Sequence, residues 1–314
     1  MSRHQRRQVA SMSTPRIVSL LPAGTELVCA LGHGANLAGR SHECDHPPWI
    51  TALPVCSKPR LDPAASAADI DKSVKSLLRQ GLGVFEVDTQ RIEETGADII
   101  VTQTQCEVCA VSEDQLRTAA ADYLGASLRI VSLSAADLAG LAEDIKVLGG
   151  ALDASAAADE LNNAMRASFS AIADAAAGRA RSTVVCLEWT SPLMTAGNWM
   201  PEIIDLAGGQ ALLADAGRPS QWTHWSSIRA ANPDVILISP CGFTLERAAA
   251  SARDLARLPG WSDMRAVRER RVFALEGHHL FNRPGPRLVD SARALAEVLH
   301  GEPERTAGPN WRRL

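Results

Sequence analysis

Apolar positions recur along this chain with two different periods, and the clearest run has the period of a helix. Between residues 153 and 177 apolar side chains return at steps of three and four residues: Leu161, Met165, Phe169, Ile172 and Ala176. Such spacing places them on one stripe of a helix. Asp153 or Ser155 can cap its first turn, and Gly178 can take the left-handed conformation that ends it. With a rise of about 1.5 Å per residue, this helix spans about 35 Å, close to the width of a small domain.

Short aliphatic and β-branched runs alternate with amphipathic segments on both sides of this helix. Before it, we expect strands at residues 16–21, 36–40, 98–102 and 127–133, and helices at 26–31, 69–80, 88–96, 113–124 and 135–148. After it, we expect strands at residues 182–187, 234–239 and 271–274, and helices at 201–207, 226–231, 244–258 and 286–299. The alternation of strand and helix predicts an α/β fold with mostly parallel sheets flanked by helices.

The two sides of the helix also repeat one cassette. The segments RIEETGADIIVTQ (residues 91–103) and SIRAANPDVILISP (227–240) each predict a short helix, a turn with Asp and a buried strand. Ligands of open α/β sheets bind outside the carboxyl ends of the strands. We therefore expect a ligand cleft between two lobes, in a binding protein rather than an enzyme. The predicted division is an N-terminal lobe at 15–152, a linking helix at 153–178, a C-terminal lobe at 179–300, and flexible tails at 1–14 and 301–314.

Composition narrows the class of protein. The net charge of −4 does not indicate a nucleic-acid-binding surface, and no run approaches the roughly 20 apolar residues of a membrane span. No apolar stretch follows Arg6 and Arg7, so we expect a cytoplasmic protein, whereas a differently assigned N-terminus would favour the periplasm or the cell surface. Seven cysteines, an odd number, fit a reducing compartment. We expect a monomer.

Five segments, taken in order, resemble one family. They are RIVSLLPAGTELVCALG, SHECDHPPW, ADIIVTQTQCEVCAVSEDQL, LEWTSPLMTAGNWMPEIIDLAGG and HHLFNRPGPRLVD, within residues 15–300. The pattern resembles the cobalamin-binding branch of the helix-linked (class III) substrate-binding proteins of ABC importers. This resemblance implies that cobalamin or a related corrinoid is held between the lobes without chemistry, and that an ABC permease is the partner. Haem and iron–siderophore complexes stay open as ligands, because they need a similarly broad aromatic cleft.

The resemblance also implies ligand-binding roles for side chains in the matching loops: His46, Trp49, Trp189, Trp199, Trp222, Phe281 and Arg283. Broad apolar walls with few polar contacts suit a large planar ligand. His279, next to His278, is a further candidate as an axial metal ligand. Glu113 and Glu246 lie where acidic residues of the family dock onto the permease.

Two loops that follow predicted strands carry metal-ligating side chains: His42, Cys44, His46, Cys106 and Cys109. Thiolates and imidazoles together suit zinc, iron or another soft to borderline metal, which predicts a metal site if the loops converge. The alternative is that the thiols are small buried apolar groups and the histidines line the cleft. A cytosolic metal-binding protein or enzyme that reuses the scaffold would act through this site. The sequence contains neither a G-x-x-x-x-G-K-[ST] phosphate loop nor a G-x-S-x-G nucleophile elbow.

Overall fold

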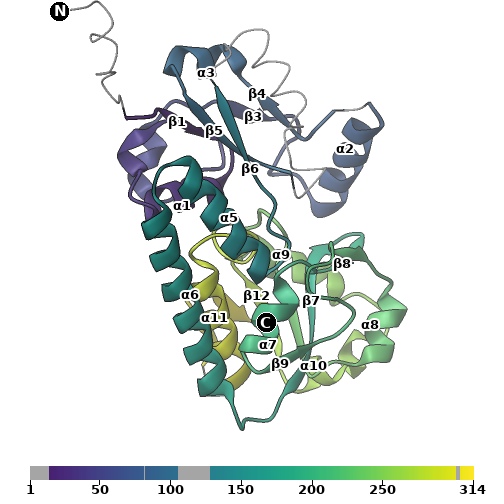
Figure 1. The fold of residues 1–314 in the computed structure, drawn as a ribbon. Helices are drawn as coiled ribbons and strands as arrows, with labels where there is room; N and C mark the ends of the chain where they lie inside the picture. Colours follow the sequence, from purple (N-terminus) through teal and green to yellow (C-terminus); the bar gives the residue numbers. More distant parts are fainter. Residues whose placement is uncertain (1–13, 81, 105–127, 302–304) are drawn as a thin grey trace, which may run out of the picture.

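The computed structural model describes residues 14–80, 82–104, 128–301 and 305–314, and it contains two sheets with helices packed around them (Figure 1). The first sheet is fully parallel, with the strand order β2-β1-β5-β6. Its strands are β1 (Ile17–Ser19), β2 (Leu37–Arg40), β5 (Ile99–Gln103) and β6 (Arg129–Leu133). The helices of this region are α1 (Pro22–Ala30), α2 (Ala67–Arg79), α3 (Thr89–Thr95) and α5 (Leu138–Ala151). Two further strands on either side of α2 in the sequence, β3 (Ser57–Pro59) and β4 (Phe85–Val87), pair antiparallel with each other.

The second sheet has a parallel centre and antiparallel strands on both sides, so the prediction of a mostly parallel sheet is wrong there. The strand order is β10-β8-β7-β11-β12-β14-β13, and β9 pairs with the start of β7. Its strands are β7 (Ser182–Thr190), β8 (Leu193–Thr195), β9 (Gly209–Ala211), β10 (Gln221–Trp222), β11 (Val235–Ile238), β12 (Val272–Leu275), β13 (Ala307–Gly308) and β14 (Trp311–Arg313). The antiparallel strands β8, β10, β13 and β14 each span only two or three residues. Strands this short leave no periodic signal in a sequence.

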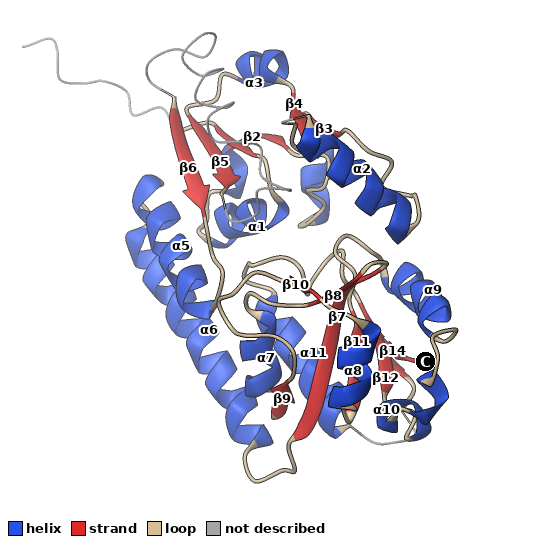
Figure 2. Ribbon diagram, turned by 90° about the vertical axis from the view of Figure 1, so that its right-hand side faces the viewer, coloured by secondary structure: helices blue, strands red, loops and turns tan. Residues whose placement is uncertain are grey.

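Helices cover both faces of the second sheet (Figure 2). In β7 Val184 and Val185 point to opposite faces, because side chains alternate along a strand. Val184 belongs to an apolar cluster with residues of α7 (Met200–Leu206) and α11 (Leu288–His300). Val185 belongs to a second cluster with residues of α8 (Trp225–Ala231), α9 (Leu245–Leu255) and α10 (Arg265–Arg268). The sheet is therefore the middle layer of three.

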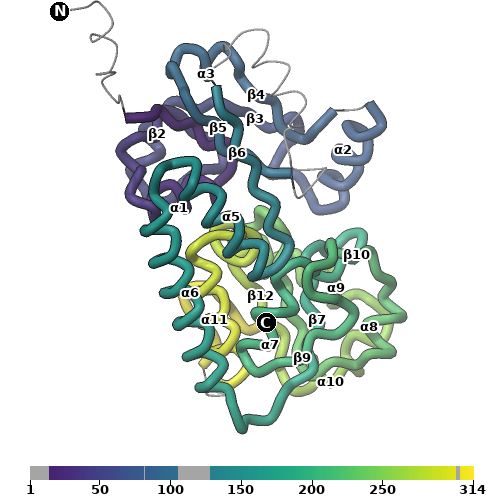
Figure 3. The backbone as a smooth tube through the Cα atoms, in the orientation of Figure 1, coloured from purple at the N-terminus to yellow at the C-terminus, as the bar shows by residue number. Residues whose placement is uncertain are grey.

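The predicted long helix is α6 (Ser155–Ala176), which lies between the two sheets in the sequence and contacts α5, α7 and α11. Met165, Ile172 and Ala176 of its apolar stripe are buried, whereas Leu161 and Phe169 are partly buried against the same core. That apolar cluster runs without a break from the helices of the first sheet to those of the second. In Figure 3 the teal stretch of α5 and α6 accordingly joins the purple-to-blue part of the chain to the green-to-yellow part.

The last residues of the chain contradict the predicted flexible tail. The strand β14 pairs antiparallel with β12, and β13 pairs with β14. Trp311 is only 1% exposed, and its ring packs edge-on against Phe273 with the ring centroids 5.7 Å apart. Its indole N–H donates to the carboxylate of Glu297 at 3.1 Å. A single large apolar ring with a satisfied N–H thus fixes a segment that has little apolar content otherwise. The expected tail at 1–14 lies outside the described residues except for residue 14.

The repeated cassette is confirmed in atomic detail. The helix α3 ends at Gly96 and α8 ends at Asn232, and both residues have left-handed backbone angles, with φ of 60° and 42°. Two residues later an aspartate accepts a hydrogen bond from the backbone N–H at the start of the neighbouring parallel strand. Asp98 accepts from Arg16 at 2.8 Å, and Asp234 accepts from Thr183 at 2.8 Å. The Asp in each predicted turn therefore joins two parallel strands at their N-terminal ends.

We expect Asp234→Asn to lower the free energy of unfolding by about 1 kcal/mol at pH 7, since it weakens the hydrogen bonds from Thr183. Burial alone would raise the pKa of Asp234, but the hydrogen bonds from Thr183 and Arg265 outweigh it and lower this pKa. A depressed pKa in the folded state contributes stability above the ordinary Asp value of about 3.9, and that stability is lost as the pH falls through the folded value. The difference in the free energy of unfolding between the parent and Asp234→Asn, measured in urea, should therefore be smaller at pH 3 than at pH 7. The matched control is Asp254→Asn, which alters an exposed ion pair. If Asp234→Asn lowered the free energy of unfolding equally at both pH values, the role assigned to the ionised Asp234 would be contradicted.

Candidate functional site

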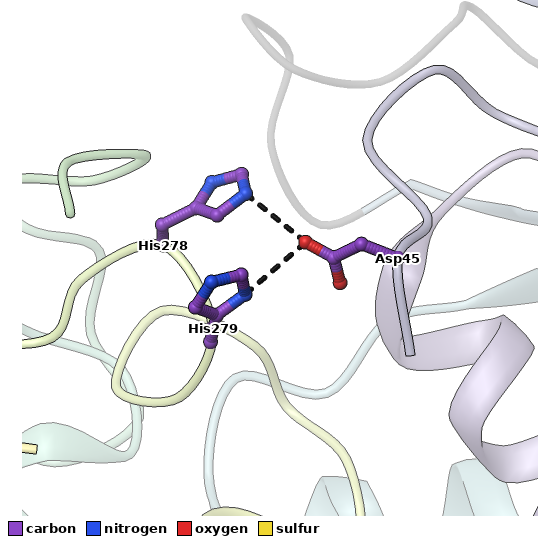
Figure 4. A group of neighbouring side chains, drawn as sticks. All are labelled: Asp45, His278 and His279. Carbon is purple, nitrogen blue, oxygen red and sulfur yellow. Dashed lines mark ion pairs between the residues drawn. The ribbon is translucent and has the colours of Figure 1, made fainter. Parts of the chain in front are cut away.

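Loops at the carboxyl ends of β2 and β12 meet between the two sheets. Asp45 lies on the loop after β2, and His278 and His279 lie on the loop between β12 and α11. His278 Nε2 and His279 Nδ1 each lie 3.1 Å from the same oxygen, Oδ2 of Asp45 (Figure 4). We call these three residues the Asp–His–His cluster.

Buried charges on the two sides of this junction are paired. Arg283 donates from Nη1 to Oδ1 of Asp45 at 2.6 Å and from Nη2 to the backbone carbonyl of Glu43 at 3.2 Å. Arg287 donates to both carboxylate oxygens of Glu26, which lies buried in α1, at 2.6 and 2.9 Å. Burial alone would lower the pKa of Arg283, but Asp45 outweighs it and raises this pKa. Two arginines at the start of α11 thus bind two carboxylates of the first part of the chain.

A buried carboxylate orients the histidine pair. Glu276 follows β12 directly, and its Oε1 accepts hydrogen bonds from the backbone N–H groups of His278 and His279 at 3.0 and 3.2 Å. Its Oε2 accepts from the backbone N–H of Leu245 at 3.0 Å. Glu276 and Asp45 are not among the site residues predicted from the sequence. The signal for Glu276 is its place directly after the apolar strand VFAL, and Asp45 lies in the predicted loop SHECDHPP.

A cavity of about 560 Å³ lies beside the cluster. Asp45, His46 and His279 form one part of its lining, and charged side chains along α11 form much of the rest: Arg287, Asp290, Arg293 and Glu297. Two of the predicted ligand-binding residues, His46 and His279, therefore share a wall of one cavity. The lining is mixed, because Leu280, Ala294, Pro309 and Trp311 also contribute to it, and the charged groups can hold water, ions or a polar group.

The predicted aromatic residues separate into two groups. Trp189 and Trp222 lie on one row of the second sheet, because Met194 of β8 pairs with Trp189 on one side and with Trp222 on the other. Phe243 packs edge-on against Trp189 at 5.4 Å between centroids. Trp199 and Phe281 instead lie in the apolar core, where the Trp199 indole N–H donates to the Phe281 carbonyl at 2.9 Å. The expectation that these two residues line a cleft is therefore wrong for this conformation, because the core buries both rings.

The start of α2 and the segment before it cover the Trp189 and Met194 part of the Trp189–Met194–Trp222 row. The indole N–H of Trp189 donates to the carbonyl of Ala67 at 3.1 Å, and Ala67 and Ile70 pack against the same apolar cluster. Arg247 of α9 donates to the carbonyls of Pro63 and Ala65 at 2.6 and 2.9 Å. The ammonium of Lys75 lies 5.3 Å from the centre of the Trp222 ring, which is otherwise largely exposed.

The structure does not bring the predicted metal ligands of the loop at residues 41–46 together. His42 hydrogen bonds to Ser57 Oγ at 2.8 Å, and Cys44 is buried with its Sγ atom 3.1 Å from the hydroxyls of Thr25 and Ser41. Burial raises the pKa of the Cys44 thiol, which opposes the thiolate form that metals bind. Cys106 and Cys109 lie outside the described residues. Among the described residues, only the Asp–His–His cluster groups three metal-ligating side chains.

The remaining candidates are placed as follows. Trp49 is half exposed in the short helical turn Pro48–Ala52, beside Gly34. Glu246 is exposed in the first turn of α9, with a long ion pair to Arg312 at 3.7 Å. Glu113 and the helix expected at 113–124 lie outside the described residues. No helix in the described ranges combines the length and apolar character needed to cross a membrane.

Comparisons with known proteins show which family this chain resembles. Residues 84–278 match the model of a family described as periplasmic binding protein. The uncharacterised ABC transporter substrate-binding lipoprotein YvrC of Bacillus subtilis (strain 168) is 22% identical over 292 residues, which are 91% of this chain and 80% of that protein.

Solved structures share the fold. A periplasmic heme-binding protein from Pseudomonas aeruginosa superposes with a TM-score of 0.72 at 21% identity, covering 95% of this chain and 97% of that one. The periplasmic vitamin B12-binding protein BtuF of Vibrio cholerae gives a TM-score of 0.65 at 19% identity, covering 91% and 96%. Since the family model covers more than half of the 314 residues, the chain belongs to the periplasmic binding protein family, as a non-enzymatic substrate-binding protein of the ABC-transporter type.

Proposed function

We propose that this protein captures a corrinoid, cobalamin in the first place, and delivers it to an ABC permease. The observation that carries the proposal is the Trp189–Met194–Trp222 row, which forms a broad apolar surface at the end of the second sheet. Rings and thioethers on such a surface contact the faces and edges of a large planar ligand over a wide area. The ligand would take the place of Ala67 and Ile70, which pack against Trp189 and Met194 in this conformation, and would extend over the exposed Trp222.

The named relatives support this class of ligand. One structural neighbour is named as a vitamin B12-binding protein and another as a heme-binding protein. Both ligands are broad macrocycles around a metal ion, and a row of rings suits either of them. The row does not by itself distinguish a corrin from a porphyrin, so the experiment below compares the two.

We also propose a location outside the cytoplasm, in place of the cytoplasmic location expected from the sequence. The relatives are named as a lipoprotein and as periplasmic proteins, and such proteins meet their permease at the outer face of the membrane. The exposed Glu246 at the start of α9 is the permease-docking candidate within the described residues. Glu113 stays a candidate from the resemblance alone.

Titration of the purified protein with hydroxocobalamin should produce a saturable change in the visible spectrum of the corrin. Trp222→Ala removes a ring that is 57% exposed, so it should leave the fold intact. We expect it to weaken the affinity about tenfold, in the range found when an aromatic anchor of an interface is truncated. The measurement is the dissociation constant from the spectral change, checked by calorimetry.

Trp49→Ala is the matched control, because Trp49 is similarly exposed, at 49%, and packs beside Gly34 rather than on the strands that form the Trp189–Met194–Trp222 row. A loss of affinity in Trp49→Ala equal to that in Trp222→Ala would refute the row as the binding surface. Parallel titrations with haemin and a ferric siderophore test the ligand itself. Tighter binding of either one than of hydroxocobalamin would overturn the corrinoid assignment.

A further inference from the structure

We propose that Asp45, His278 and His279 form a binding site for one divalent transition-metal ion, with zinc as the reference ion. Their ligand atoms all lie within 4.8 Å of one another, and both imidazole nitrogens lie 3.1 Å from Asp45 Oδ2. Ligand atoms bound tetrahedrally to zinc at about 2.0–2.1 Å stand about 3.3 Å apart. The two N···O separations therefore need to change by only a few tenths of an ångström to admit the ion, and the two imidazole nitrogens, at most 4.8 Å apart, would approach each other as it binds.

The two rings converge on one point and do not stack. Their planes are inclined at 67°, and their centroids are 4.5 Å apart. As Figure 4 shows, each ring directs one nitrogen at the carboxylate oxygen from its own side. Adjacent residues in a regular strand point to opposite faces of the sheet, so this convergence depends on the loop backbone. Glu276 holds that backbone through its two hydrogen bonds to the histidine N–H groups.

Outer contacts of the kind that orient metal ligands are already formed. Arg283 binds Oδ1 of Asp45 at the short distance of 2.6 Å, whereas its second nitrogen lies 3.2 Å from Oδ2, the oxygen that the histidines face. Hydrogen bonds from neighbouring side chains to a ligating carboxylate are typical of metal sites and fix the ligand's orientation. The ion would be held by one oxygen of Asp45 while Arg283 holds the other.

The local charge favours a cation. Arg283 and Arg287 form ion pairs with Glu26 and Asp45. The third carboxylate, Glu276, accepts hydrogen bonds from uncharged backbone N–H groups, so these three carboxylates exceed the two guanidinium groups by one negative charge. Asp45 and His279 also line the cavity of about 560 Å³, so a water molecule can reach the fourth position of a tetrahedral ion.

The donor set selects the class of ion. Two imidazole nitrogens and one carboxylate oxygen suit zinc, cobalt, nickel or ferrous iron, whereas magnesium and calcium favour sites built from oxygen. The site takes ligands from loops of both sheets, so a bound ion would tie the two parts of the molecule together. A metal ion at the Asp–His–His cluster needs no corrinoid, and the cluster is distinct from the thiol-based site expected from the sequence, of which Cys106 and Cys109 lie outside the described residues.

The test uses the full chain, stripped of metal with a chelator and free of corrinoid. We expect one zinc ion per chain by competition against a chromophoric chelator, a rise of the melting temperature with zinc, and visible absorption bands of tetrahedral character with cobalt(II). His279→Ala and Asp45→Asn should each weaken zinc binding about 100-fold or more, since loss of an outer partner alone costs 10–100-fold. His224→Ala, at an exposed histidine elsewhere, should bind zinc like the parent.

Two results would overturn the proposal: no saturable zinc binding in the parent, or equal affinity in His279→Ala and His224→Ala. Asp45→Asn leaves Arg283 without its main partner and can unfold, so circular dichroism must first show that the variant is folded. His279 is more exposed than Asp45, and it keeps the test decisive if Asp45→Asn does not fold. The corrinoid titration is made on separate samples, so failure of one proposal does not affect the other.

Discussion

Replacing Trp311 with alanine is expected to lower the free energy of unfolding by about 3–5 kcal/mol, as for other fully buried large rings. The ring is 1% exposed and fills the space between α11 and Phe273 of β12. Its removal leaves a cavity and also leaves the Glu297 carboxylate without its indole partner. The measurement is equilibrium unfolding in urea, followed by circular dichroism.

Trp49→Ala serves as the control for this experiment, because half of that ring is already exposed to solvent. We expect Trp49→Ala to lower the free energy of unfolding much less than Trp311→Ala does. If the two substitutions had equal and small effects, the pairing of β14 with β12 would not hold in solution, and residues 305–314 would behave as the flexible tail expected from the sequence.

Replacing Arg283 with alanine is expected to lower the free energy of unfolding by a similar amount, about 3–5 kcal/mol, for an electrostatic reason. The side chain is 7% exposed, and its removal leaves Asp45 without its closest cationic partner. It also leaves Glu26 with Arg287 as its only close cationic partner among the described residues. Breaking a buried ion pair from one side costs this much because the remaining charge is uncompensated. Unfolding in urea at pH 7 gives the value directly.

Arg293→Ala is the matched control, since Arg293 forms an exposed pair with Asp290 three residues away, and such pairs contribute at most about 1 kcal/mol. A second variant tests the mechanism. If uncompensated charge causes the loss, adding Asp45→Asn to Arg283→Ala should restore part of the stability. Strictly additive losses in the double variant would show that Arg283 acts through packing rather than through Asp45.

The sequence predicted the regular elements where a periodic pattern was long enough to be read. The helix expected at 153–177 is α6 (Ser155–Ala176), and the strand expected at 234–239 is β11 (Val235–Ile238). The strands β8, β10, β13 and β14 were missed, because their two or three residues carry no period and they form only against neighbours that are already in place. Trp311 shows the same effect: its burial depends on Phe273 and α11, which no local pattern in residues 301–314 encodes.

The site was less predictable than the fold. The loop SHECDHPP was predicted to be a functional site through its Cys and His residues, and Asp45 was not among the predicted ligands. Asp45 and Arg283 are 238 residues apart, and their pairing is a tertiary event that spacing within a motif cannot specify. Trp199 and Phe281 were misplaced for the opposite reason: a loop ring is equally able to face a cleft or the core, and here the adjacent apolar cluster buries it.

The cover over the Trp189–Met194–Trp222 row has a kinetic consequence under the proposed function. Arg247 and Trp189 hold the segment before α2 through three backbone carbonyls, those of Pro63, Ala65 and Ala67. A ligand that settles on the row must wait until these hydrogen bonds open, so capture follows a rearrangement of the free protein. The observed association rate would then stop rising at high ligand concentration and level off at the rate of opening. At high ligand concentration, the opening of the protein and not the collision rate with the ligand would then limit the rate of uptake.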